Sequence, residues 1–187
     1  MPSLNTRIFE FINNAAGYYH PLDFLFIAAT SYITLVILGL AVGYYFIIYL
    51  PWHQEGMARI QAFQNAWKIV WGIFLTYIAV SIIKLLVAFP RPFQTLKNLH
   101  VLISRPNGYS FPSGHAAITM ALATSVYFYR KRLGELLFAF AFVVGMARIY
   151  VGVHYPLDVG VGFLIGYIIP KLLHIKKNPV KSFVKQN

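Results

Sequence analysis

The chain contains no cysteine and very few acidic residues, and each absence excludes a class of protein. Without cysteine it cannot form a disulfide scaffold, an iron–sulfur cluster or a zinc site built on thiolates. Only 5 of its 187 residues are Asp or Glu, and charged residues of both signs total 11%, compared with about 25% in ordinary soluble domains. A soluble domain with so little charge would expose too much apolar surface to water.

Apolar residues make up most of what is present. They account for 58% of the chain and aromatic residues for 17%, which excludes intrinsic disorder, because disordered chains are poor in both. A length of 187 residues allows one domain and hardly two. The composition therefore predicts a single integral membrane domain over residues 1–187.

Five apolar stretches predict helices that cross the membrane. Spanning the hydrocarbon core takes about 20 mostly apolar residues, and three of the five stretches are short for this purpose. Together they predict an all-α fold, a compact transmembrane bundle of about five helices. The stretches are residues 24–50, 69–89, 111–129, 136–153 and 155–173.

The N-terminal segment, residues 1–20, has a different pattern. Apolar residues recur at helical spacing within residues 3–19, and polar residues occupy the other positions, which is typical of a helix lying in the membrane interface. A frayed terminus is the alternative. The apolar positions are Leu4, Ile8, Phe11, Ile12 and Ala15.

Basic residues in the loops predict the orientation. Arg59, Lys68, residues 130–132 and the basic tail over residues 174–187 fall on one side of a five-span bundle. Because cytoplasmic loops are rich in Lys and Arg, this side and the C-terminus are expected in the cytoplasm, and the loop over residues 90–109 outside. The preference for basic residues on the cytoplasmic side also explains the basic tail, so we expect no nucleic-acid partner.

Ionisable side chains inside membrane spans are costly and usually functional. The chain places Lys84, His115, Arg148, His154 and Asp158 at helix ends that this topology brings to the outer face. Arg91 follows Lys84 by seven residues, so both side chains share a direction if the helix continues to Pro90. We expect all of these groups to form one site.

Three cations near two histidines suit a phosphate ester or anhydride, whose transition state spreads negative charge over oxygens. The backbone N–H groups of Ser113 and Gly114, at the start of a helix, are expected to form an anion-binding site. Asp158 is the one acidic residue near the site, too few for a magnesium cage. Two histidines and Asp158 are a conceivable zinc set, but the Lys and Arg side chains would repel the ion, so we expect no metal and no cofactor.

Three short motifs follow one another in a fixed order. Residues 84–92 read Lys-x6-Arg-Pro, residues 112–115 read Pro-Ser-Gly-His, and residues 148–158 read Arg-x5-His-x3-Asp. Each motif alone is weak evidence, but the three in this order are specific. Together they resemble the signature of the type-2 phosphatidic-acid phosphatase superfamily of membrane lipid phosphatases.

This resemblance implies a role for each site residue. His154 would be the nucleophile that forms a phosphohistidine, Asp158 would orient it, and His115 would act as general acid and then base. No metal takes part in that scheme. The residues expected to bind the phosphoryl group are Lys84, Arg91, Ser113, Gly114 and Arg148. Ala147 departs from the family pattern, which usually has Ser before the Arg.

Two further features have open interpretations. Lys97 and Arg105, in the loop over residues 90–109, are either solvated or contact the second phosphate of a diphosphate substrate. Gly162 and Gly166 form a small-residue pair that we interpret as a helix contact within the bundle, with dimerisation as the alternative. The oligomeric state stays open.

The resemblance implies dephosphorylation of a lipid-linked phosphate or pyrophosphate at the outer membrane face. The small size resembles the bacterial members, and conversion of undecaprenyl diphosphate to undecaprenyl phosphate is the leading interpretation. Phosphatidylglycerophosphate, phosphatidic acid and lipid A are the alternative substrates. A non-catalytic binder or transporter of lipid phosphates is the alternative of a different class, and the His154–Asp158 pair argues against it. Vanadium haloperoxidases share the phosphate-binding motifs, but they are soluble proteins, so this function is disfavoured for a membrane-embedded chain.

Overall fold

A computed structural model describes residues 3–31, 39, 43 and 52–175, and every secondary-structure element within these residues is a helix. This confirms the all-α class. The helices are α1 (Leu4–Asn13), α2 (His20–Thr30), α5 (Gly56–Val87), α6 (Pro92–Thr95), α7 (Gly114–Tyr127), α8 (Lys131–Tyr150) and α9 (Pro156–Ile175).

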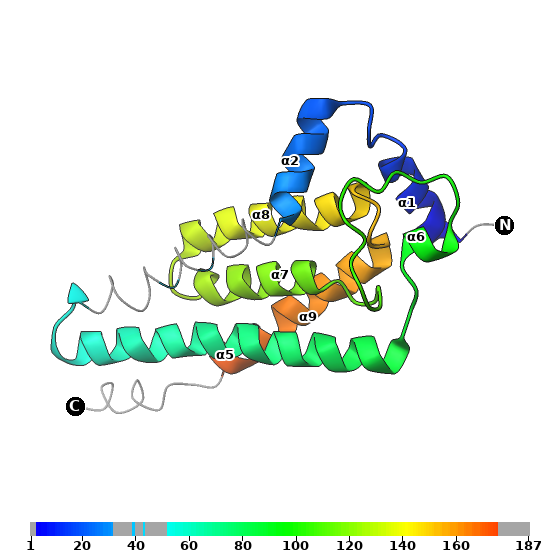
Figure 1. Ribbon diagram of the computed structural model, residues 1–187. Coiled ribbons are helices and arrows are strands. Elements are labelled where there is room, and N and C mark those ends of the chain that lie inside the picture. Colours follow the sequence, from blue (N-terminus) through cyan, green and yellow to red (C-terminus); the bar gives the residue numbers. More distant parts are fainter. Residues whose placement is uncertain (1–2, 32–38, 40–42, 44–51, 176–187) are drawn as a thin grey trace.

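Helix α7 is the centre of the bundle. It packs against α5, α8 and α9, and Figure 1 shows α5, α7 and α8 lying alongside one another while α9 crosses them. Eleven of its 14 residues are buried, and five of those are alanine or serine, whose small side chains let neighbouring helices approach closely. A helix that is apolar on every side belongs in the interior, as α7 does.

The close approach of α9 to α7 depends on two glycines. A Cβ atom at Gly162 would lie 2.7 Å from the carbonyl oxygen of Ser113, and one at Gly166 would lie 2.2 Å from that of Ala117. Both distances are far shorter than a real carbon–oxygen contact. The prediction that this pair makes a helix contact inside the bundle is therefore confirmed.

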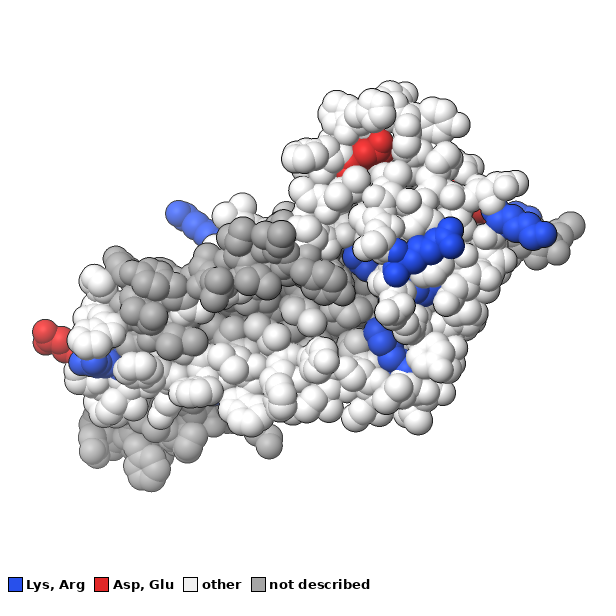
Figure 2. All heavy atoms as spheres, in the orientation of Figure 1, with Lys and Arg blue, Asp and Glu red and all other residues white. Residues whose placement is uncertain are grey.

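Three helices in the described part of the chain are long and apolar enough to cross a membrane, namely α5, α8 and α9. Helix α5 has 32 residues, about 48 Å, and carries no charged residue between Lys68 and Lys84. Figure 2 shows Lys and Arg side chains toward the two ends of the molecule, with none along the middle of α5. This is the charge distribution of a helix that crosses a bilayer.

The predicted spans have other bounds than the observed helices. Helix α5 begins at Gly56 rather than at residue 69, and two further stretches match their helices poorly. The stretch over residues 111–129 contains α7, which is only 14 residues or about 21 Å long, shorter than the roughly 30 Å hydrocarbon core. In the stretch over residues 24–50, α2 starts earlier, at His20, and ends at Thr30, because Ser31 is extended. Most of the remainder lies outside the described residues. An apolar run does not mark where its helix stops.

The predicted N-terminal helix is present but shorter, since α1 ends at Asn13. Phe9, Asn13 and Ala16 are buried against the rest of the protein. Leu4, Ile8 and Phe11, three of the five predicted apolar positions, are exposed at 74%, 40% and 82%. The predicted stripe therefore faces away from the bundle, while a second face of α1 holds the helix in place.

Buried polar side chains tie α1, α2 and the long loop to the end of α8. Asn13 donates to the carbonyl oxygens of His100 and Tyr150, and its own oxygen accepts from the His100 N–H. Asp23 accepts from the Gly17 N–H at 3.0 Å and from the Tyr150 hydroxyl at 2.7 Å. These bonds fix the end of the bundle where the candidate site lies.

The glycine contact generates a test with a matched control on the same helix. Gly166→Ala places a methyl group against a backbone carbonyl and is expected to destabilise the fold by about 1–3 kcal/mol. Gly160→Ala adds the same methyl group where nothing lies within 4 Å, so it should leave stability unchanged or slightly raised. Thermal unfolding in detergent measures both variants. Equal melting temperatures would contradict the packing role of Gly166.

Candidate active site

Lys84 and Arg91 reach one site, but not along one helix. Helix α5 ends at Val87, and Ala88 has a left-handed backbone with φ of 49°. The condition that the helix continues to Pro90 is therefore not met. The turn at Ala88 brings Arg91 back over the helix end, so both side chains still line the same cavity.

That cavity has a volume of about 1020 Å³ and lies at the end of the bundle where α5 and α8 end and α7 begins. Six of the eight predicted catalytic and phosphate-binding residues line it: Lys84, Arg91, Gly114, His115, Arg148 and His154. The other two, Ser113 and Asp158, are buried directly behind this wall. The three sequence motifs thus converge on one place.

His154 lies between a carboxylate and a guanidinium. Its Nδ1 is 3.4 Å from Asp158 Oδ2, and its Nε2 is 3.2 Å from Arg91 Nη1. Arginine can only donate, so Nε2 must carry the lone pair and Nδ1 the hydrogen. Burial, followed by the positive charges of Arg148 and Arg91, holds the pKa of His154 well below its usual value. The imidazole is therefore neutral, with its basic nitrogen toward the cavity.

The carboxylate of Asp158 is held by groups other than the histidine. Oδ2 accepts from the Ser110 hydroxyl and from the Tyr155 N–H at 2.9 Å. Ser110 is fully buried, and the sequence reasoning missed it. Its only sequence signal is its place two residues before the Pro-Ser-Gly-His motif. These donors fix the carboxylate that faces His154.

Backbone carbonyls, rather than carboxylates, hold the two cations of the first motif. Arg91 donates to the carbonyl oxygens of Asn107, Gly108 and Val153. Lys84 donates to those of Tyr109 and Ser110, at 2.9 and 3.2 Å. Carbonyl dipoles satisfy the donors without cancelling the charge, so the cavity keeps a positive potential that attracts an anion.

The third cation is held by an unpredicted partner. Arg148, in the last turn of α8, donates from Nη1 to the hydroxyl of Thr30 at 3.0 Å. Ala147, the departure from the family pattern, is fully buried beside it. Thr30 comes from α2, which lies outside all three motifs.

Only part of the predicted anion-binding site at the start of α7 is free to bind an anion. The N–H of Ser113 donates to the backbone carbonyl of Asp158 at 2.9 Å, so it does not face a ligand. The Ser113 hydroxyl is fully buried and has no hydrogen-bond partner within the described residues. The Ser113 N–H is therefore not available to an anion, while Gly114 lines the cavity.

Lys97 and Arg105 are absent from the cavity lining, although Ser104 and Pro106 belong to it. The Arg105 guanidinium lies 5.7 Å from the ring centre of Phe93. Their contact with a second phosphate stays a prediction without support from this geometry.

The PAP2 superfamily profile matches residues 65–179, well over half of the chain. The chain belongs to the PAP2 superfamily. This confirms the resemblance identified from the three motifs and, with it, the interpretation of the chain as a hydrolase of the lipid phosphatase class.

Individual PAP2 proteins are similar over different lengths. Undecaprenyl-diphosphatase BcrC of Bacillus subtilis is 27% identical over 182 residues, which cover 97% of this chain and 88% of that protein. Bacitracin transport permease protein BcrC of Bacillus licheniformis is 38% identical over 96 residues, so the match spans 51% of this chain and about half, 47%, of that protein. The crystal structure of Aquifex aeolicus LpxE matches with a TM-score of 0.74 and 29% identity, covering 92% of this chain and 96% of that one.

The protonation state of His154 can be measured directly. Because its pKa is lowered, the ring should stay neutral as the pH falls through the ordinary imidazole value of about 6.5. Histidine ¹⁵N NMR in detergent, with the signal assigned through His154→Gln, should show no titration of this ring between pH 6 and 8. A midpoint near 6.5 would contradict the described environment.

Ser110→Ala tests the support of Asp158. Removing a buried donor to a carboxylate is expected to lower the rate of phosphate release by roughly 10-fold or more, because hydrogen bonds to charged groups contribute about 1.5–3 kcal/mol. Ser125→Ala is the matched control, since Ser125 is equally buried but lies on α7 away from the cavity. Equal rates for the two variants would show that Ser110 does not support the site.

Proposed function

We propose that the protein removes a phosphate group from a lipid-linked phosphate or diphosphate, with His154 as a metal-independent nucleophile. One observation carries this proposal. A buried neutral histidine directs its basic nitrogen toward a cationic cavity and has a fixed carboxylate behind it. A protein that only bound or transported lipid phosphates would need the cations, but not this pair.

In the first step, His154 Nε2 attacks phosphorus. Burial and the nearby Arg148 lower the pKa of His115, so it takes up a proton only when the negative charge of the bound substrate offsets the cations. The N–P bond forms while the bond from phosphorus to the leaving oxygen breaks, and the protonated His115 gives that oxygen a proton. Arg91 leaves its contact with Nε2 and turns to a phosphoryl oxygen, which Lys84 and Arg148 also stabilise. Asp158 stabilises the positive charge that develops on the ring.

In the second step, water attacks the phosphohistidine. His115, now neutral, takes a proton from the water as the O–P bond forms and the N–P bond breaks. Inorganic phosphate leaves, His154 is neutral again, and His115 has regained its proton. Positive charge in this scheme comes from Lys84, Arg91 and Arg148, which replace the Lewis acid of a metal-dependent phosphatase.

The apolar part of the cavity favours a lipid substrate. Its lining includes Ile27, Tyr77, Val80, Ile103 and Ile118, which come from several helices and the long loop. Apolar walls next to a cationic end match a hydrocarbon tail bearing a phosphate. Undecaprenyl diphosphate is the substrate we propose, because one relative that matches this chain over nearly its whole length is named undecaprenyl-diphosphatase BcrC.

The site is proposed to face the outside of the cytoplasmic membrane, with the C-terminus in the cytoplasm. The basic residues Arg59, Lys68 and Arg130–Arg132 lie at the opposite end from the cavity, in line with the positive-inside rule. We also propose that α1 lies in the outer interface, where its exposed Leu4, Ile8 and Phe11 would contact acyl chains.

The test is phosphate release by the purified protein in detergent with EDTA present. The panel is undecaprenyl diphosphate, phosphatidylglycerophosphate, phosphatidic acid and a lipid A phosphate. We expect the fastest release from undecaprenyl diphosphate, with no loss in EDTA and a fall of at least 10³-fold in His154→Asn, because the nucleophile is missing.

His174→Asn is the matched control, because His174 is a partly buried histidine at the other end of α9. It should retain activity close to that of the wild type. Inhibition by EDTA would contradict the metal-independent scheme, and a different best substrate would replace undecaprenyl diphosphate. No release from any lipid by folded protein that still binds lipid phosphate would favour the binder or transporter.

A further inference from the structure

Thr30 is a buried hydroxyl at the proposed phosphoryl site that no sequence motif indicates. It is the last residue of α2, is 3% exposed, and lines the cavity together with Arg148 and His154. It precedes Arg148 by 118 residues. Its place in the cavity wall is therefore a product of tertiary packing.

The hydrogen bonding of Thr30 is half complete. Its oxygen accepts from Arg148 Nη1 at 3.0 Å. A hydroxyl can also donate one hydrogen bond, and no acceptor for the Thr30 hydrogen occurs among the described residues. A buried donor without an acceptor is unfavourable, and a phosphoryl oxygen in the cavity would satisfy it.

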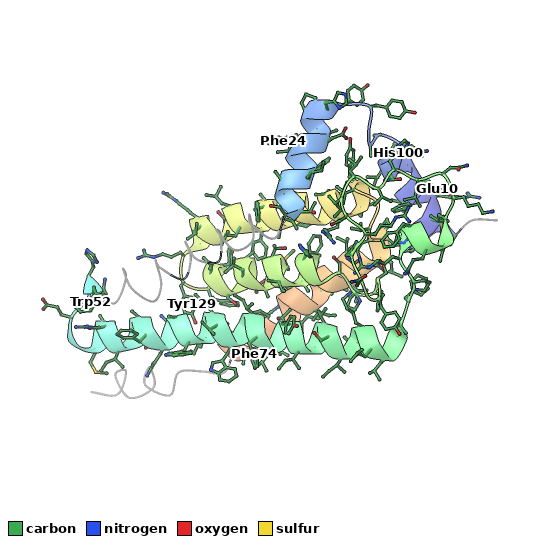
Figure 3. The ribbon with its side chains drawn as sticks, viewed as in Figure 1. Glu10, Phe24, Trp52, Phe74, His100 and Tyr129 are labelled. Carbon is green, nitrogen blue, oxygen red and sulfur yellow. The ribbon has the colours of Figure 1, made fainter. Side chains whose placement is uncertain are left out.

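The position of Thr30 is fixed by two contacts between α2 and α8. Asp23, in the first turn of α2, accepts from the Tyr150 hydroxyl at 2.7 Å, and Thr30 meets Arg148 at the other end of the helix. Phe24 of the same helix (labelled in Figure 3) is 75% exposed, whereas Asp23 and Thr30 are buried. Helix α2 therefore presents Thr30 to the site from a packed face.

We propose that Thr30 is a phosphoryl-binding residue, which accepts a hydrogen bond from Arg148 and donates its own hydrogen to a phosphoryl oxygen of the substrate. This inference rests on the proposed phosphatase function. Accepting from a guanidinium polarises the hydroxyl and makes it a stronger donor. The Arg148–Thr30 pair then offers one phosphoryl group two donors from two different helices.

The test compares Thr30→Val, which has the same shape without the hydroxyl, with Thr30→Ser, which keeps the hydroxyl. Hydrolysis of undecaprenyl diphosphate gives kcat/KM, and orthovanadate, a phosphoryl transition-state mimic, gives an inhibition constant. Thr30→Val should lower kcat/KM roughly 10- to 100-fold and weaken vanadate inhibition in parallel, as expected for the loss of one donor to an anion. Thr30→Ser should stay within about threefold of the wild type.

Thr124→Val is the matched control for folding. Thr124 is equally buried, but its hydroxyl donates to the Met120 carbonyl at 2.8 Å, away from the cavity. It should leave kcat/KM and the vanadate constant unchanged. The proposal is overturned if Thr30→Val matches the wild type, or if Thr30→Ser is impaired as much as Thr30→Val, which would assign the effect to packing of the methyl group.

Binding of orthovanadate, followed as a shift in melting temperature, separates this inference from the proposed function. A wild-type protein that hydrolyses no lipid refutes the proposed function, yet weaker vanadate binding by Thr30→Val alone still supports the phosphoryl contact. Absence of vanadate binding by the folded wild type overturns both.

Discussion

The architecture of the site depends on holding three cationic side chains beside His154 with very little negative charge. Arg91 and Arg148 are buried and Lys84 is partly buried, and burial of charge is costly. The cost is reduced by hydrogen bonds to neutral acceptors. Lys84 and Arg91 use carbonyl oxygens, and Arg148 uses the hydroxyl of Thr30. The donors are satisfied while the positive potential remains available to an anionic substrate.

The same contacts are linked to the backbone at this end of the bundle. Residues 107–110 have an irregular backbone, so their carbonyl oxygens are not used within a helix and accept from Lys84 and Arg91 instead. Asn13 holds an earlier part of the same loop, because its side chain donates to the His100 carbonyl and accepts from the His100 N–H. Helix α7 starts only at Gly114, and the glycines of α9 pack against it. The loop can therefore lie next to the N-terminal end of α7.

The same positive charges control the chemistry of His154. They disfavour a further positive charge on His154, which keeps its imidazole neutral. The Asp158 carboxylate lies next to Nδ1 of the ring, so the ring hydrogen is held on that nitrogen. A phosphate dianion in the cavity would be attracted by the positive charge of Lys84, Arg91 and Arg148. Binding of the substrate and activation of the nucleophile are therefore two consequences of one electrostatic arrangement.

The sequence by itself determined the membrane composition, the three motifs and the packing pair Gly162 and Gly166, because these depend on residue type and short spacing. The tertiary structure decided where α2 and α5 end, and hydropathy cannot show this, since apolar residues continue past both ends. It also decided how Arg91 reaches Lys84, through a left-handed turn at Ala88 rather than a shared helical face. Ser110 and Thr30 were invisible because hydrogen-bond partners 48 and 118 residues away are chosen by packing, which leaves no local pattern in the chain.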